Sequence, residues 1–215
     1  PFCYSHAIVE KQADVSSMAG VATQPSEVAE RAQRGLLAPV AAVMPSLRWE
    51  MVAYAALLAV AAVLRFWDLG SRAYHHDESM HAVYSWYLYT GRGYEHNPMM
   101  HGPFQFEANT LIFTLFGASD YTGRMLYAAL GTALVGLPFF LRPYLGRLGA
   151  LCVAGLLAFS PTMLYFSRFA RNDILMAVWT LGLVICMWRY MDERRPGYLY
   201  GFAALLAFSF STKEN

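Results

Sequence analysis

The sequence predicts an all-α, polytopic transmembrane helical bundle, and three observations lead there. The 215 residues are 57% hydrophobic, 15% aromatic and only 14% charged, which is too apolar and too poor in charge for an ordinary soluble domain. About five apolar segments approach the ~20 residues that a spanning helix needs. A long polar and aromatic stretch separates the first two of them. We therefore expect the N-terminal fragment of a membrane protein with about five spans and a long first loop.

Charge and cysteine content narrow the classes of protein. The formal net charge is +1, so no basic field points to nucleic acid. Cys152 and Cys186 fall inside apolar runs and Cys3 lies near the N-terminus, so no pair indicates a disulfide framework or a metal site. The first residues, 1–47, lack sustained periodicity and are expected to be a disordered cytoplasmic leader or an upstream extension. Residues 48–215 would then form the N-terminal part of the membrane domain.

The predicted spans differ in length but share aromatic and arginine flanks, which are typical anchors at a membrane interface. Their ranges are 49–67, 121–141, 148–166, 174–188 and 198–210. The first loop, 68–120, is much longer than the later connections, and loops of that length tend to carry function. Within it, 79–89 and 106–116 have apolar residues at helical spacing and are expected to be amphipathic interfacial helices.

The placement of Lys and Arg favours an extracytoplasmic first loop only slightly, because the two sides carry nearly equal numbers of them. Arginines that remain on the outer side need another explanation, and an anionic ligand is one.

The densest group of reactive side chains is His75-His76-Asp77-Glu78, directly after the first span. Two adjacent carboxylates can supply a general base and a metal or hydrogen-bonding partner, because like charge and partial burial raise one pKa. The alternative is that Asp77 and Glu78 only favour a helix N-terminus electrostatically. The acidic pair alone does not decide between the two.

Further charged residues fall on the same side of the membrane under this topology. Arg168 and Arg171 could bind a phosphate and Asp173 could orient one of them, although snorkelling arginines followed by a helix cap explain the same pattern. Arg124 begins the second span, and Glu214 follows the fifth. Ionisable groups gathered at membrane depth favour a functional site.

A metal site has less support. Five of the six histidines lie in the first loop, but His76 and His81 are five residues apart, which does not place two ligands on one helix face. No cofactor is therefore predicted with a defined site, and a divalent metal stays open.

Several strings together resemble the protein O-mannosyltransferase-like branch (family 39-like) of the GT-C membrane glycosyltransferases. The strings are HHDES, HNPMMHGPF, SDYTGR, SPTMLYFSRFARNDIL and TKEN, in order from about residue 49 to 215. The similarity is greatest to the flippase-activity-associated subfamily of archaea and bacteria. Family members continue through several more spans, so this chain looks like a fragment that is inactive alone.

The resemblance implies a hexosyltransferase with a polyprenyl-phosphate sugar as donor and an active site on the extracytoplasmic side of a prokaryotic plasma membrane. It assigns Asp77 as the base, with Glu78 as its catalytic neighbour, and it directs Arg124 and Arg168 to the lipid phosphate. Three more residues, His101, Asp173 and Glu214, match subfamily motifs and are expected to bind substrate. Membrane lipid is an implied partner; the donor sugar and the acceptor are not identified.

Two other classes of protein fit part of the pattern. In a lipid-linked sugar flippase or transporter the same charges would line a translocation path, but Pro138 and Pro161 are isolated rather than part of repeated broken spans. A non-catalytic membrane subunit of glycan assembly would require that the acidic pair be dispensable.

Overall fold

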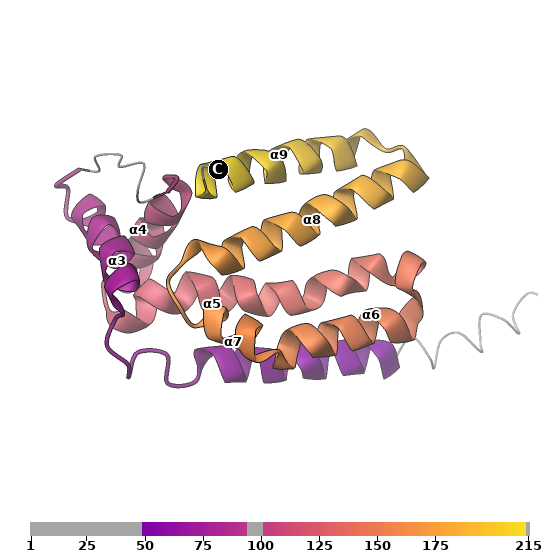
Figure 1. Ribbon diagram of the computed structural model, residues 1–215, viewed down its shortest axis with the longest axis horizontal. Helices are drawn as coiled ribbons and strands as arrows, with labels where there is room; N and C mark the ends of the chain where they lie inside the picture. Colours follow the sequence, from indigo (N-terminus) through magenta and orange to yellow (C-terminus); the bar gives the residue numbers. More distant parts are fainter. Residues whose placement is uncertain (1–48, 94–100, 214–215) are drawn as a thin grey trace, which may run out of the picture. The chain divides into compact units, whose positions relative to one another are not determined.

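The computed structural model describes residues 49–93 and 101–213, and every regular element in these ranges is helical. The predicted leader, 1–47, and Glu214 lie outside the described residues. After a first helix, Trp49–Phe66, the elements are α3 (His76–Tyr89), α4 (Phe104–Phe116), α5 (Asp120–Gly136), η3 (Leu137–Leu141), α6 (Arg142–Phe159), α7 (Pro161–Ser167), α8 (Asn172–Glu193) and α9 (Pro196–Thr212) (Figure 1). The predicted all-α class is confirmed.

Three helical stretches of the described chain are long and apolar enough to cross a membrane: Trp49–Phe66, Asp120–Phe159 and Asn172–Glu193. The second stretch contains α5 and α6, which run in opposite directions in Figure 1. The last helix, α9, has 17 residues. The helical membrane bundle is therefore established, and the count of five crossings stays a prediction.

One predicted span is interrupted. The segment 148–166 is not a single helix, because α6 ends at Phe159 and α7 begins at Pro161. Ser160 between them has ψ 122°, far from helical, and its side chain accepts a hydrogen bond from the Met163 N–H. Proline lacks the N–H that would continue α6 but suits the first turn of a new helix. Because the whole segment is apolar, its sequence shows no signal of this break. The break turns the chain towards the site.

The interior is built from two groups of apolar side chains between the helices. Tyr127 and Leu134 of α5 pack with Ile174 and Leu175 of α8. In the second group Val135 of α5 packs with small residues of the first helix and α6, which are Ala61, Ala154 and Ala158 and which let these helices approach one another. Close approach through small residues is the usual way in which helices associate within lipid.

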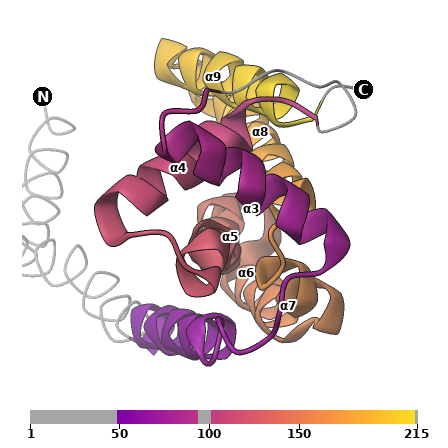
Figure 2. The same ribbon diagram turned by 90° about the vertical axis from the view of Figure 1, so that its left-hand side faces the viewer.

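The two loop helices lie together at one end of the bundle. Figure 1 shows α3 and α4 beside the start of α5 and the end of α9, and Figure 2 looks onto this end, where they lie over α5. Both were expected, with α3 starting three residues and α4 two residues earlier than the predicted 79–89 and 106–116. A capping box starts α3: His75 accepts from the Asp77 N–H, and Glu78 accepts from the His75 N–H.

Candidate active site

A buried ion pair joins α3 to α5. Glu78 and Arg124 are 0% and 1% exposed, with Arg124 Nε 2.9 Å from Glu78 Oε1 and Nη2 3.0 Å from Oε2. Glu78 also accepts from the backbone N–H groups of His75 and Ala170, each at 3.0 Å. One carboxylate thus ties α3 to α5 and to the chain between α7 and α8.

Arg124 has no spare donor for a ligand in this arrangement. Besides Glu78, its guanidinium donates to the carbonyls of Leu69, Arg72 and Ala73 at 3.1, 2.7 and 3.3 Å. Together these contacts account for all five N–H donors of an arginine. We call Glu78, Arg124 and these three carbonyls the buried cluster; it fixes the loop that leads into α3.

The electrostatics of the buried cluster keep Glu78 ionised. Burial alone would raise the pKa of this carboxyl, but hydrogen bonds from Arg124 and from the Ala170 and His75 amides hold it below its ordinary value. A carboxylate with a depressed pKa and so many donors is a poor proton acceptor at neutral pH. Its geometry is that of a group that holds other groups in place.

The neighbouring carboxylate has a different setting. Asp77 is 36% exposed, and its Oδ2 lies 3.3 Å from Nη1 of Arg171. The Nε of Arg171 lies 3.7 Å from Asp173 Oδ2, so Arg171 bridges two partly exposed carboxylates. We call Asp77, Arg171 and Asp173 the open cluster. Its carboxylates retain lone pairs that a substrate hydroxyl can reach.

A cavity of about 400 Å³ lies beside the buried cluster, between the loop after the first helix, the start of α5 and α7 with the residue that follows it. Arg72, Arg124 and Arg168 line it, with Tyr165 and Leu164. Contacts with the carbonyls of Leu64 (2.8 Å) and Asp68 (3.3 Å) use two N–H donors of Arg168.

The exposed guanidinium of Arg72 stacks near Tyr165 and Phe169, 5.9 and 5.7 Å from their ring centroids, and its Nη2 lies 3.7 Å from Glu78 Oε2. Guanidinium groups in such a cavity suit an anion, phosphate above all.

His101 is placed by an unusual backbone. It has a φ of 67°, and the N–H of the next residue, Gly102, donates to the Thr212 carbonyl at the end of α9. A Cβ at Gly102 would lie 2.0 Å from the Ser211 carbonyl oxygen, so only glycine permits this contact. The chain of the first loop is thereby joined to the end of α9, one residue before Lys213.

His81 lies one turn after Asp77 on α3. It is 6% exposed, and its Nδ1 is 2.7 Å from the amide nitrogen of the buried Gln105. Burial, with His101 and Arg171 nearby, lowers the pKa of His81 to about 4. At neutral pH this imidazole is uncharged and serves as a buried hydrogen-bonding group.

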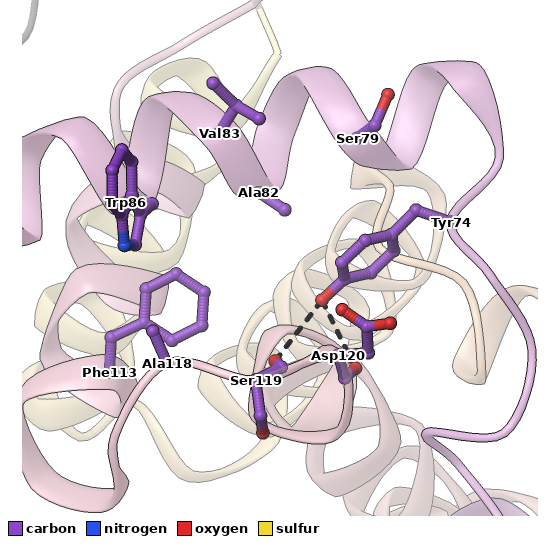
Figure 3. A pocket seen from close by; sticks show the side chains of 9 residues that line it. All are labelled: Tyr74, Ser79, Ala82, Val83, Trp86, Phe113, Ala118, Ser119 and Asp120. Carbon is purple, nitrogen blue, oxygen red and sulfur yellow. Dashed lines mark hydrogen bonds between the residues drawn. The ribbon is translucent and has the colours of Figure 1, made fainter.

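A second, open pocket of about 260 Å³ lies on another face of α3 (Figure 3). Ser79, Ala82, Val83 and Trp86 of α3 line it at helical spacing, and the Tyr74 hydroxyl donates to the carbonyls of Ser119 and Asp120. Since each helical residue turns by about 100°, Asp77 falls on the opposite face of α3. This pocket is separate from the open cluster.

Among the described residues, no group of three or more His, Cys, Asp or Glu side chains is arranged to hold a metal ion.

The structure brings most of the residues expected in the site to one end of the bundle. Asp77 and Glu78, adjacent in sequence, face different partners. Arg124 lines the cavity, but its N–H donors are used by Glu78 and backbone carbonyls. Arg168 reaches the cavity, whereas Asp173 belongs to the open cluster. Arg72 was not among the residues expected in the site, because a lone arginine in a loop gives no periodic or motif signal.

Comparison with known proteins adds a family. Residues 100–215, more than half of the chain, match the family model described as dolichyl-phosphate-mannose-protein mannosyltransferase. The matched region begins after α3, so Asp77 and Glu78 lie outside it. No curated protein and no solved structure matches the chain. The chain belongs to the dolichyl-phosphate-mannose-protein mannosyltransferase family, whose members are membrane glycosyltransferases that use a polyprenyl-phosphate-linked sugar.

Proposed function

We propose that this protein transfers a sugar from a polyprenyl phosphate to an acceptor hydroxyl at the extracytoplasmic face of the membrane, with Asp77 as general base. One observation carries the proposal: a single buried ion pair, Glu78–Arg124, adjoins both a partly exposed carboxylate, Asp77, and an arginine-lined cavity, to whose lining Arg124 belongs. The buried cluster would hold both at a fixed separation, which a two-substrate reaction requires. Within the family, the HHDES and TKEN strings favour the flippase-activity-associated subfamily of prokaryotes.

The donor phosphate would occupy the cavity lined by Arg72 and Arg168. Both guanidiniums have N–H donors beyond those used in their contacts with the protein, and the planar fork suits phosphate oxygens. Arg124, directed to the phosphate by the family resemblance, would act indirectly, by holding the backbone of Arg72.

The reaction that follows is a direct displacement. The acceptor oxygen forms a bond to the anomeric carbon while the bond from that carbon to the phosphate oxygen breaks, and the electron pair leaves with the polyprenyl phosphate. The acceptor proton passes to a carboxylate oxygen of Asp77. Negative charge grows on the departing phosphate, where Arg72 and Arg168 would stabilise it.

The remaining residues would support the acceptor side. Arg171 would orient Asp77, with Asp173 as its second partner. His101, beside the end of α9, and Glu214 keep their predicted role in substrate binding. Glu78 would position the site rather than take the proton, because its oxygens already accept four hydrogen bonds.

The extracytoplasmic placement is the one that the family resemblance implies, and four arginines at the opposite end of the bundle support it: Arg142, Arg147, Arg194 and Arg195, at the ends of α6, α8 and α9. Positive residues favour the cytoplasm. In a variant whose native cysteines are serine, Arg92→Cys should react with an impermeant maleimide added to intact cells, and Arg195→Cys only after permeabilisation. The reverse pattern would place the site in the cytoplasm.

The function itself is tested by transfer of a labelled sugar from a short polyprenyl phosphate in membranes that contain the intact enzyme. Asp77→Asn should lower turnover by about 10²-fold or more, the usual scale for loss of a general base. Asp192→Asn, an exposed carboxylate at the other end of the bundle, is the matched control and should transfer normally. Normal transfer by Asp77→Asn would remove this base, and no transfer by the unaltered enzyme would favour a flippase or a non-catalytic subunit.

A further inference from the structure

A second arginine is buried near the cavity, in the first helix. Arg65 is 0% exposed and donates to Ser167 Oγ (3.2 Å), to the carbonyls of Ala61 (3.3 Å) and Ala158 (3.4 Å), and to that of Leu157 (3.0 Å). All four acceptors are neutral. A charged group this deep in a bundle needs a reason beyond packing.

The break between α6 and α7 supplies part of that reason. In a continuous helix the Leu157 carbonyl would accept from the residue four positions later, but that residue is Pro161, which has no N–H. The Nη2 of Arg65 fills this position. Because the C-terminal end of a helix carries partial negative charge, a guanidinium there is favoured electrostatically.

Hydrogen bonds run in both directions between the first helix and the segment formed by α6, α7 and Arg168. Arg65 of the first helix satisfies carbonyls at the end of α6 and the Ser167 hydroxyl of α7. Arg168, the residue after Ser167, donates back to the Leu64 carbonyl at the end of the first helix. The position of Ser167 therefore sets where the Arg168 side chain leaves the backbone and enters the cavity.

The side chain of Ser167 is tightly packed against α5, with no room for an additional atom. A Cβ added at Gly131 of α5 would lie 2.2 Å from Ser167 Oγ and 3.2 Å from Arg65 Nε. Ser167 itself donates to the Met163 carbonyl one turn earlier, which fixes the hydroxyl so that its lone pair faces Arg65.

We infer that Arg65 is a positioning residue for donor binding: through Ser167 it aims Arg168 at the phosphate of the polyprenyl-phosphate donor. The inference rests on the proposed donor cavity and adds a residue that does not line it. It requires that Arg65 and Arg168 act in series rather than independently.

The test is a double-mutant cycle on the KM for the polyprenyl-phosphate sugar, measured with the intact enzyme. Ser167→Ala removes the acceptor of Arg65 Nε with the smallest change in volume, and Arg65→Lys keeps the charge but loses the fork. Each should raise the donor KM about tenfold, as expected for a displaced binding group, and leave the acceptor KM unchanged. Gly131→Ala should act in the same direction, whereas Gly155→Ala on α6, which has open space around it, should not.

In the Arg168→Lys background, Ser167→Ala should change the donor KM by less than about twofold, because residues acting in series are not additive. Equal fold-changes in both backgrounds would overturn the inference and leave Arg65 a purely structural residue. If Arg168→Lys by itself leaves the donor KM unchanged, the proposed donor cavity fails first. Should Arg65→Lys not be recovered from membranes, Ser167→Ala alone decides the cycle.

Discussion

The buried cluster and the open cluster contain neighbouring carboxylates, Glu78 and Asp77. The two side chains differ in solvent exposure and in the number of hydrogen bonds that they accept. Glu78 is enclosed and accepts four hydrogen bonds, whereas Asp77 is 36% exposed with one arginine contact. A carboxylate whose lone pairs are all taken can fix a geometry, and one with free lone pairs can accept a proton. Two adjacent carboxylates thus meet different surroundings because they fall on different faces of α3, and we propose that Glu78 fixes the geometry while Asp77 accepts the proton.

The largest expected effect is a loss of folding stability when the buried cluster is altered. Glu78→Gln leaves the Arg124 guanidinium buried without its counter-ion, which typically costs about 3–5 kcal/mol. The thermal midpoint of the detergent-solubilised protein should fall steeply. Glu107→Gln, an exposed carboxylate in the first turn of α4, is the control and should lie within about 0.5 kcal/mol of the unaltered protein. Equal midpoints for the two variants would contradict the role assigned to the buried cluster.

A second expectation is that folding stability falls with pH because of His81, on the same helix as both carboxylates. The pKa of His81 is about 4 in the folded state against 6.5 ordinarily, so the unfolded chain binds more protons between these values. Stability from the neutral imidazole is full above pH 6.5 and is lost as the pH falls towards 4. Between pH 7 and pH 5 the loss should be on the order of 2 kcal/mol.

Urea unfolding at a series of pH values measures this loss, and His81→Gln should flatten the dependence in that window. His76→Gln, at the exposed start of α3, should retain it. An unchanged slope in His81→Gln would mean that other groups carry the acid sensitivity.

The smallest expected effect lies in the open cluster. Arg171→Gln removes the bridge between Asp77 and Asp173, but these side chains are 36% to 41% exposed, and solvent screens their attraction. The free energy of unfolding should change by less than about 1 kcal/mol. A loss as large as that of Glu78→Gln would show that the two clusters do not differ in kind.

Much of the fold followed from composition and hydrophobic period. The two loop helices and the helical membrane bundle are readable because apolar residues recur at helical spacing. The break at Ser160 was missed, since an isolated proline in an apolar run fits a spanning helix as well as a helix start. Three contacts between distant parts of the chain could not be predicted from any local pattern. The N–H donors of Arg124 are all used by Glu78 and backbone carbonyls, and Arg171 forms an ion pair with Asp77. Arg65 donates to Ser167, which lies 102 positions away in the sequence.

The division of work between the two carboxylates is tested most directly by one paired measurement on Asp77→Asn and Glu78→Gln. Thermal midpoint, binding of a polyprenyl-phosphate analogue and sugar transfer are measured on the same preparations. Asp77→Asn should keep the thermal midpoint of the unaltered protein and bind the analogue normally, while sugar transfer falls by about 10²-fold. In Glu78→Gln the thermal midpoint should fall and analogue binding should be lost with it. A stable, analogue-binding Glu78→Gln without transfer, beside an active Asp77→Asn, would contradict the account by exchanging the two roles.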